Sequence, residues 1–297
     1  MKVAVIINPV AGPVWSRRPT AEVEAAARAI VEHHSGEASV VFTQGPGHAR
    51  DLAREAIGGG ADVVVAWGGD GTVNEVASAL VSGRATLGIV PIGSGNGLAR
   101  ELGIPIDPDA ALDVALTGAD TVIDVGELNG RLFFNIAGMG YDAQVAEAFA
   151  AAVVPVRGFV AYGVATLREL LRHQPHRYVV TADGQRCEDG RALFICAANT
   201  RQWGNGARIA PHARTDDQLL DLVFVSARHP VFVVANMWRL FWGDIADMRG
   251  VRHRRISHAV IEADPAAPLH VDGEPIGRAA RIEIHVRGRA LRVRVPL

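Results

Sequence analysis

The stretch DVVVAWGGDGTVNE, residues 62–75, decides the fold class of this chain. A short apolar run, residues 62–67, leads into a glycine-rich turn, residues 68–71, and then into a helical pattern. A glycine-rich turn from the end of a strand into the start of a helix lets backbone N–H groups converge on an anion, assisted by the helix dipole. The stretch therefore predicts a strand, an anion-binding turn and a helix in direct succession.

The alternation of strands and helices continues on both sides of this stretch, over the first 120 residues. The expected strands are residues 2–8, 38–43, 62–67 and 86–91, and the expected helices are residues 20–34, 48–57 and 72–81. This alternation indicates a parallel sheet with helices on both faces, and ligands on such sheets bind outside the carboxyl ends of the strands. A second glycine cluster, residues 93–97, follows the fourth strand, with Asn96 as a candidate helix cap.

From about residue 121 the pattern changes to short strands. The expected strands are residues 121–128, 131–137, 177–182, 192–198, 219–226, 259–263, 269–271, 281–286 and 291–295. Two helical stretches, around residues 158–172 and 231–248, interrupt them. The pattern predicts a mainly antiparallel β domain with helical insertions. We place the α/β domain at residues 1–122, with the last strand, residues 288–297, as a candidate addition to it, and the β-rich domain at residues 123–287.

Composition narrows the class of protein. A hydrophobic content of 49% with 21% charged residues excludes a disordered chain. The net charge of −2 argues against a dedicated nucleic-acid binder. Two cysteines are too few for a disulfide framework or a zinc site. Because no run reaches the roughly 18–20 apolar residues of a membrane span, we expect a cytoplasmic protein.

Lys2 is the only lysine, and every other basic residue of the 30 is an arginine. This excludes mechanisms that need an internal lysine, such as a Walker-A loop, the β3 lysine of protein kinases or a pyridoxal Schiff base. Any phosphate bound by this chain must be held by backbone N–H groups, arginine or a metal ion.

Several acidic residues allow both a structural and a functional interpretation. Thr72 and Glu75 fit a capping box at the start of the helix. Capping does not explain Asp70, which is useful among phosphate-binding amides chiefly if a cation such as Mg²⁺ mediates. The turn at residues 271–275 reads from pattern alone as a polar hairpin. Residues 215–217 are either a turn or an oxygen-rich cation site.

A competing motif is GMGYDA, residues 138–143, which satisfies the dinucleotide-binding pattern G-x-G-x-x-A. In that motif a second parallel strand that ends in an acid should follow about 20 residues later. Residues 159–172 instead have a helical pattern. We therefore interpret the match as accidental.

Taken together, seven segments resemble the diacylglycerol kinase catalytic family, the bacterial lipid kinases and sphingosine kinases that share a nucleotide-binding fold with NAD kinases. They are INPVAG (7–12), GGDGTVNE (68–75), PIGSGNGLAR (91–100), IDVG (123–126), NIAGMGYDA (135–143), APHARTDDQLLD (210–221) and VDGEP (271–275). The resemblance implies an NAD kinase-like α/β nucleotide-binding domain followed by a β-sandwich domain that binds lipid.

The same resemblance implies an ATP- and Mg²⁺-dependent kinase of a lipid hydroxyl. It places ATP at Asn8, Thr43, Gly68, Gly69, Asp70, Gly71, Thr72, Asn74, Gly93, Ser94, Gly95 and Asn96. Glu274 would be the general base, and Asp70 would join Asp124 in a magnesium network around the phosphates. A second, structural Mg²⁺ would lie at Asp217, with the backbone carbonyls of Arg214 and Leu219.

The chain departs from the family pattern at three places. Gly97 stands where many bacterial members carry an aspartate, and Gln218 replaces the usual glycine beside Asp217. Residues 13–14 replace a frequent loop lysine, whose charge Arg17 or Arg18 could supply. Two alternatives stay open: an NAD kinase-like or other small-alcohol kinase, and a catalytically impaired nucleotide- or lipid-binding regulator.

The segment 231–248 suits either a membrane interface or core packing. Its large apolar side chains are Phe232, Met237, Trp238, Leu240, Phe241 and Trp242. The arginines that follow, Arg249, Arg252, Arg254 and Arg255, suit either anionic headgroups or a solvated edge strand. We expect a lipid substrate, peripheral membrane contact and no nucleic-acid partner. A homodimer is left open.

Overall fold

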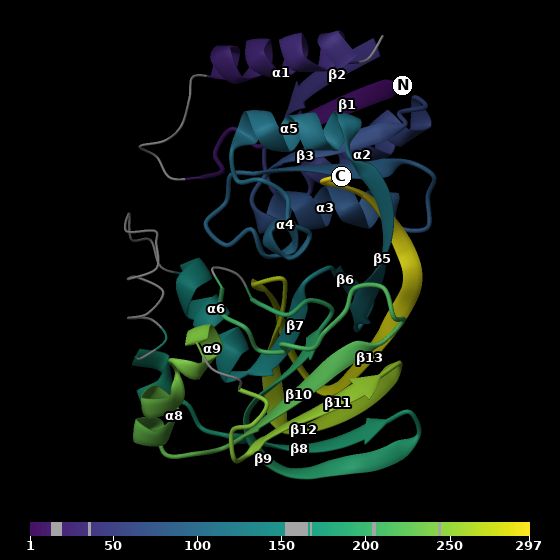
Figure 1. Cartoon of the computed structure of the whole chain (residues 1–297). Coiled ribbons are helices and arrows are strands. Elements are labelled where there is room, and N and C mark those ends of the chain that lie inside the picture. Colours follow the sequence, from purple (N-terminus) through teal and green to yellow (C-terminus); the bar gives the residue numbers. More distant parts are fainter. Residues whose placement is uncertain (13–19, 35–36, 152–165, 167, 204–205, 243–244) are drawn as a thin grey trace. The chain divides into compact units, whose positions relative to one another are not determined.

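The computed structural model describes residues 1–297 except 13–19, 35–36, 152–165, 167, 204–205 and 243–244 (Figure 1). The chain divides into two compact units. Unit 1 comprises Met1–Ile123 and Arg289–Leu297, and unit 2 comprises Asp124–Gly288. Arg17 and Arg18, and most of the expected helix 158–172, lie outside the described residues.

The centre of unit 1 is a parallel sheet in the order β2-β1-β3-β4. Its strands are β1 (Lys2–Ile7), β2 (Glu37–Phe42), β3 (Val63–Gly68) and β4 (Thr86–Pro91). The last part of β13 (Glu274–Val295) extends this sheet, because Val293 pairs in parallel with Leu87. Since Ile7 is in register with both Phe42 and Trp67, the strands end at one edge.

Helices cover this sheet in two groups. They are α1 (Thr20–His34), α2 (His48–Gly58), α3 (Asp70–Leu80), α4 (Gly97–Glu101) and α5 (Pro108–Thr117). Right-handed crossovers in this strand order place α1 on one face and α2 and α3 on the other, and α5 packs against α1. The sequence interpretation did not include α5, although it carries a start signal: Asp107 accepts a hydrogen bond from the Ala110 N–H, and Pro108 follows it.

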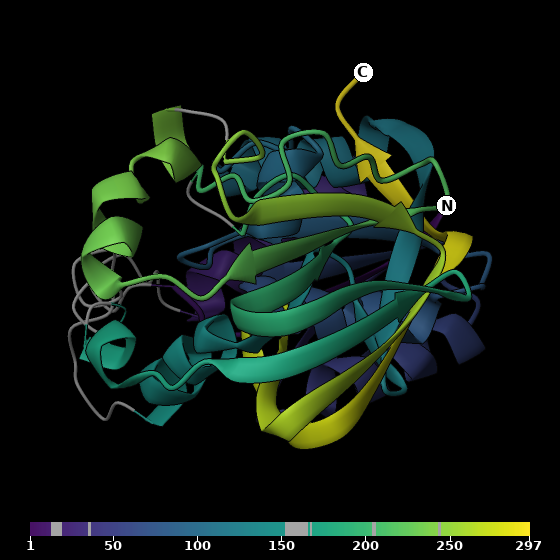
Figure 2. The same ribbon diagram turned by 90° about the horizontal axis from the view of Figure 1, so that it is seen from below.

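Unit 2 is built from antiparallel strands, which Figure 2 shows in teal, green and yellow. The described strands are β5 (Ala119–Leu128, which begins in unit 1), β6 (Arg131–Phe133), β7 (Ile136–Gly140), β8 (His176–Ala182), β9 (Gln185–Ala198), β10 (Leu220–Ser226), β11 (Val251–Ile256), β12 (His258–Val271) and β13. The path β11-β10-β9-β7-β12-β13 is antiparallel throughout its paired neighbours, and β8 pairs with both β9 and β12.

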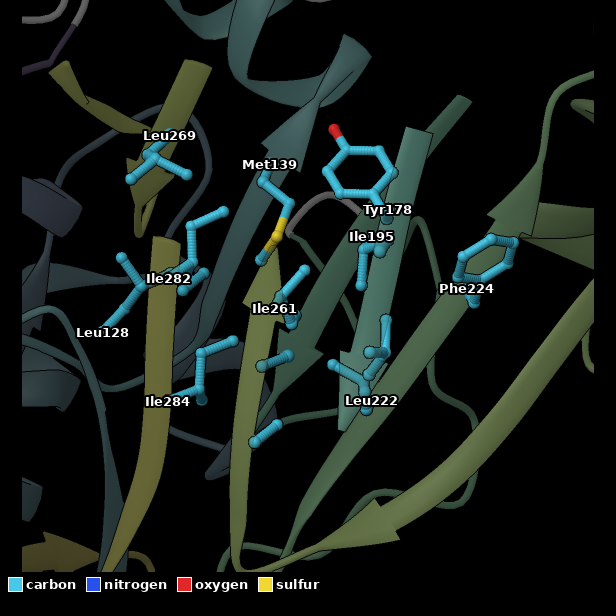
Figure 3. Packing of buried hydrophobic residues seen from close by; sticks show 14 of the residues in the cluster. Leu128, Met139, Tyr178, Ile195, Leu222, Phe224, Ile261, Leu269, Ile282 and Ile284 are labelled. Atoms are coloured by element: carbon cyan, nitrogen blue, oxygen red, sulfur yellow. The ribbon is translucent and has the colours of Figure 1, made fainter. Parts of the chain in front are cut away.

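Alternation along these strands divides the apolar side chains between two cores. On β10, Leu222 belongs to one cluster and Val223 to the other. The first cluster also contains Met139, Tyr178 and Ile261, and is filled from nearly every strand of the unit (Figure 3). The second lies against α6 (Tyr141–Ala151), through residues such as Tyr141. Each face of the sheet is thus buried in one of the two clusters, as expected for a sandwich-like unit.

Several elements differ from the expected ranges. Residues 131–137 divide between β6 and β7, whereas the two expected strands within 259–271 form one irregular strand, β12. The expected helix 231–248 is instead two short helices, α8 (Pro230–Asn236) and α9 (Arg239–Trp242). Arg252, Arg254 and Arg255 lie on β11 (Val251–Ile256), at the end of the sheet order, as the edge-strand alternative expects, and Arg249 precedes that strand. Within the described residues, no helix is long and apolar enough to cross a membrane.

Candidate active site

Three loops of unit 1 meet where β1, β3 and β4 end; we call residues 8–12, 68–72 and 93–97 the loop cluster. A Cβ atom on Gly93 would lie 2.7 Å from the Cα atom of Gly69, closer than real Cβ contacts. A Cβ atom on Gly12, whose φ is 78°, would lie 2.8 Å from the carbonyl oxygen of Ile92. These glycines are therefore required because backbone meets backbone.

Asp70 joins two loops of the cluster through its carboxylate. Oδ2 accepts a hydrogen bond from the Asn96 N–H at 2.9 Å, and Oδ1 accepts one from the Gly97 N–H at 2.8 Å. Burial raises the pKa of Asp70, while the hydrogen bonds from Gly97 and Asn96 oppose that rise. Because these two donors lie at the start of α4, Asp70 performs the capping role expected of Asn96. A cation is thus not needed to explain an acid in this turn.

Asn96 is left with an unused acceptor. It has a left-handed φ of 52°, and its Nδ2 donates to the Gly93 carbonyl at 2.9 Å. Its Oδ1 atom is buried and has no hydrogen-bond partner among the described residues. Since a buried polar atom without a partner is costly, this atom is a candidate contact for a bound ligand or cation.

The expected capping box is wrong. Helix α3 begins at Asp70 with Gly69 as its N-cap, so Thr72 and Glu75 lie inside the helix. The Thr72 hydroxyl accepts a hydrogen bond from Asn8 Nδ2 at 2.9 Å, which attaches the first loop to the second. The Glu75 carboxylate accepts from the N–H groups of Gly47 at 2.7 Å and Ala49 at 3.0 Å, at the start of α2.

The remaining sequence-predicted nucleotide residues lie on or beside the loop cluster. Thr43 follows β2, and its N–H donates to the Ile7 carbonyl at 2.9 Å. Ser94 is exposed, and a Cβ atom on Gly95 would lie 2.8 Å from Asp70 Oδ2. Asn74, one turn into α3, accepts a hydrogen bond from Ser78. Gly71 lies in the first turn of α3, where helix geometry leaves backbone N–H groups without intrahelical acceptors.

In unit 2, the turn between β12 and β13 is the expected hairpin. Asp272 and Gly273 both have positive φ, 48° and 85°, as a two-residue type I′ turn requires. The Asp272 carboxylate accepts hydrogen bonds from three consecutive N–H groups, those of Phe134, Asn135 and Ile136, at 2.9–3.1 Å. Glu274, the next residue, is exposed. The turn is thus held in place by backbone donors, and Glu274 at its end is an exposed residue.

A buried pair that the sequence interpretation missed supports the same turn. His270 Nδ1 accepts the Gly273 N–H at 3.2 Å, so His270 Nε2 carries the proton and donates to Asp142 Oδ2 at 3.2 Å. A Cβ atom on Gly138 would lie 1.8 Å from that Asp142 oxygen. The first glycine of the GMGYDA segment is therefore required for packing. Its strand, β7, pairs antiparallel with both neighbours, unlike the strands of a dinucleotide-binding motif.

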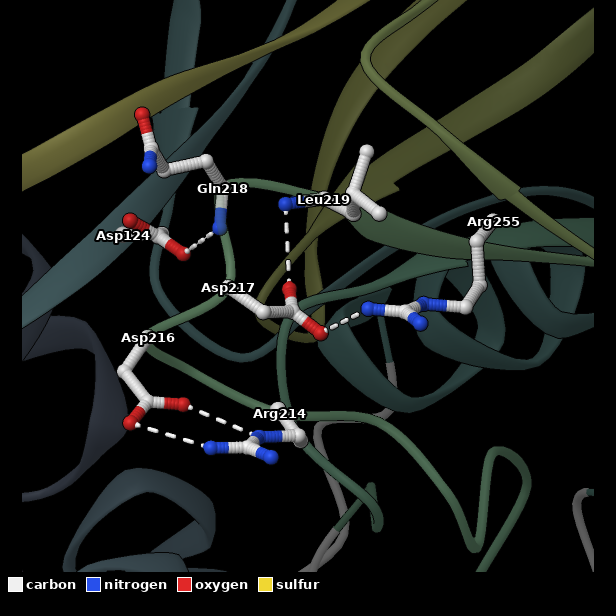
Figure 4. Close-up of polar contacts among 7 residues, drawn as sticks. All are labelled: Asp124, Arg214, Asp216, Asp217, Gln218, Leu219 and Arg255. Atoms are coloured by element: carbon white, nitrogen blue, oxygen red, sulfur yellow. Dashed lines mark hydrogen bonds and ion pairs between the residues drawn. The ribbon is translucent and has the colours of Figure 1, made fainter.

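The predicted ligands of the structural metal ion lie on the loop 214–219, which we call the Asp217 loop, and Asp124 of β5 contacts that loop (Figure 4). Asp217 Oδ1 accepts the Leu219 N–H at 3.1 Å, and its Oδ2 contacts the guanidinium of Arg255. Asp124 Oδ2 accepts the Gln218 N–H at 2.6 Å, and the Arg214 side chain pairs with Asp216.

This arrangement does not fit a metal site. The one carboxylate expected to bind the ion already binds a cationic side chain. Within the described part of the chain, no three His, Cys, Asp or Glu side chains gather, so no cluster of such side chains is available there to strengthen the expected set of one carboxylate and two backbone carbonyls.

Comparisons with known proteins agree on the family. Residues 2–128 match the diacylglycerol kinase catalytic domain, and residues 135–295 match the YegS C-terminal NAD kinase beta sandwich-like domain. A "Probable lipid kinase YegS-like" of Pseudomonas aeruginosa is 34% identical over 262 residues, covering 88% of this chain and 85% of that protein. A protein of the same name from Chromohalobacter salexigens is 36% identical over 234 residues, covering 75% and 73%.

Solved structures share the fold at low identity. A "putative diacylglycerol kinase" from Bacillus anthracis superposes with a TM-score of 0.82 at 21% identity, covering 99% of this chain and 97% of that one. An NAD kinase from Archaeoglobus fulgidus, solved in complex with ATP, gives a TM-score of 0.54 at 12% identity, covering 99% and 93%.

Proposed function

The chain belongs to the family of kinases that carry a diacylglycerol kinase catalytic domain followed by a YegS C-terminal NAD kinase beta sandwich-like domain, and on that premise we propose that it transfers the γ-phosphate of ATP to a lipid hydroxyl. The observation that carries the proposal is the loop cluster, in which Asp70 binds the two glycine turns together. The names of the curated relatives support a lipid as the acceptor.

The loop cluster would hold the phosphates of ATP mainly through backbone N–H groups. Beyond Lys2 the chain has no lysine for this task, and a glycine turn that leads into α3 offers N–H groups at a positive helix end. Mg²⁺ that enters with the nucleotide would neutralise charge on the phosphates. Asn96, with its unused buried Oδ1, and Asp70 are the residues proposed to face that ion. Asp124 is the acid of unit 2 proposed for the same network.

Glu274 is the proposed general base. As the lipid oxygen bonds to the γ-phosphorus, the bond from that phosphorus to the β-γ bridging oxygen breaks, and ADP leaves. The hydroxyl proton passes to the Glu274 carboxylate. The hairpin supports this role because Asp272 and His270 hold the turn in place while Glu274 is exposed.

The acceptor would be reached at a membrane surface through α8 and α9. These helices and the turn between them expose apolar side chains that a segment packed into the core would bury: Val231 is 69% exposed, Trp238 49% and Trp242 81%. Arg239 lies over the Trp238 ring at 5.2 Å, and Arg228 over the Phe232 ring at 5.7 Å. Aromatic side chains beside arginine suit the headgroup region of an anionic bilayer.

The proposed activity is tested by incubating the protein with [γ-³²P]ATP and MgCl₂. Separate reactions would contain diacylglycerol, phosphatidylglycerol, ceramide, a sphingoid base or NAD. We expect a labelled lipid with the natural chain and none with Glu274→Gln. Labelling of NAD alone would support the NAD kinase alternative, and no labelled acceptor at all would contradict the proposal in favour of a regulator.

A further inference from the structure

Arg255 meets two carboxylates of unit 2. It lies on β11 directly opposite Asp221 of β10, and its guanidinium contacts Asp217 Oδ2 (Figure 4). The Asp217 side chain is only 16% exposed, whereas that of Arg255 is 54% exposed. Burial raises the pKa of Asp221, Arg255 opposes that rise and Asp217 adds to it. One guanidinium therefore counters the charge of two acids that repel each other.

The Asp217 loop is closed without any ion. Gln218 has a left-handed φ of 62°, and its N–H donates to Asp124 Oδ2 at 2.6 Å. The Leu219 N–H donates to Asp217 Oδ1 at 3.1 Å. Asp216 pairs with Arg214 through Nε at 3.1 Å. Each acid of the loop thus has a donor or a cationic partner from the chain itself.

A divalent cation on Asp217 would have to share that carboxylate with a permanent positive charge. Arginine stays protonated at every relevant pH, so it cannot release its charge to admit a metal ion. The repulsion between the guanidinium and a dication a few ångströms away would oppose binding. The carboxylate and the guanidinium already cancel each other's charge.

We propose that the guanidinium of Arg255 takes the place of a structural divalent cation on the Asp217 loop, so that unit 2 is stable without a metal ion. The inference concerns this chain's own loop and goes beyond the proposed function, because neither ATP nor a lipid takes part in it. It also predicts that a variant without the guanidinium gains affinity for divalent cations, because the carboxylates of Asp217 and Asp221 would then lack their cationic partner.

The test is thermal unfolding of the intact, nucleotide-free protein in EDTA and in several millimolar MgCl₂ or CaCl₂, with NaCl used to match ionic strength. We expect the natural chain to unfold at the same temperature in all three buffers. Arg255→Gln should unfold about 2–4 °C lower in EDTA and recover most of that loss in CaCl₂ or MgCl₂. The double variant Arg255→Gln/Asp217→Asn should show no recovery, and Arg254→Gln, on the same strand but beside Gln185, should behave as the natural chain.

A cation response of the natural chain that Asp217→Asn abolishes would overturn the proposal, as would an Arg255→Gln variant without any response. Binding of Mn²⁺, followed by electron paramagnetic resonance of the nucleotide-free protein, covers the case in which Arg255→Gln does not fold. The natural chain and Arg255→Lys should then show no Mn²⁺ binding that depends on Asp217. Such binding in the natural chain would contradict the inference even if the kinase activity is confirmed.

Discussion

The loop cluster of unit 1 and the Asp217 loop of unit 2 both place aspartates in tight turns, but the aspartates have different partners. In the loop cluster, the Asp70 carboxylate binds two backbone N–H groups. In the Asp217 loop, the Asp217 carboxylate binds an arginine side chain as well as a backbone N–H. A backbone partner fixes the path of the chain, whereas a side-chain partner mainly balances charge. Acids that look alike in sequence can therefore be structural in one turn and electrostatic in the other.

The largest effect is expected at Glu274, the exposed acid outside both loops. Glu274→Gln should lower kinase activity by about 10²–10⁴-fold, because the lipid hydroxyl loses its proton acceptor. The free energy of unfolding, measured in urea, should change by less than about 0.5 kcal/mol. A large loss of stability would instead place Glu274 with the structural acids.

Asp70→Asn should reduce both activity and stability. An amide can present only one acceptor oxygen, so its NH₂ group would face the N–H of Asn96 or Gly97 and leave that donor unpaired. We expect a loss of about 1–3 kcal/mol in the free energy of unfolding together with weakened ATP binding. Urea unfolding and nucleotide titration measure the two quantities, and Asp51→Asn, an exposed acid on α2, is the control. Weakened ATP binding at full stability would show that Asp70 serves the nucleotide rather than the loops.

Glu75→Ala should cost about 0.5–2 kcal/mol, the usual cost of losing a helix cap. Its carboxylate accepts from two N–H groups at the start of α2, a helix whose N-cap residue, Gly47, makes no side-chain cap. Hydrogen exchange of α2 amides should increase, and those of α5 should be unchanged. Equal effects on both helices would mean that the substitution disturbs the sheet as a whole.

The smallest effect is expected at Asp217. Asp217→Asn should cost less than about 1 kcal/mol, because the ion pair with Arg255 is partly exposed and two long side chains lose freedom in forming it. Salt should distinguish the acid bound by an arginine from the acid bound by backbone N–H groups. In 1 M NaCl, most of the loss in the free energy of unfolding caused by Asp217→Asn should disappear, since salt screens exposed charges. The loss in the free energy of unfolding caused by Asp70→Asn should remain at the same salt concentration. If the loss caused by Asp217→Asn were unchanged by salt, the two aspartates would not differ in the way proposed.

The strands and helices that we expected in unit 1 agree with the structure to within one or two residues, but α5 was not expected. Buried strands such as β3 are continuous apolar runs, and α1 was placed correctly over residues 20–34. The failures arose where local signals compete. The apolar content of residues 231–248 indicated one helix, but Pro230 starts α8 and the helical hydrogen bonding is interrupted after Asn236.

The candidate site was only partly accessible to sequence reasoning. The glycines could be located, because a turn between strand and helix favours them wherever the backbone must approach closely. The partners of Asp70, Glu75 and Asp272 could not, because each carboxylate binds N–H groups at least 26 residues away along the chain. Asp142 and His270 carried no local signal at all, since they meet only when β7 and β12 pair.

By itself, the sequence determined the two-part pattern of elements, the glycine turns and the exclusion of lysine-based phosphate binding. These are local properties, set by hydrophobic periodicity, backbone freedom and composition. Only the tertiary structure decided which donor each acid meets, and hence that Asp70 caps α4 and that Asp217 binds Arg255. Sheet register and loop packing bring those groups together, and neither can be read from residues that are neighbours in the chain.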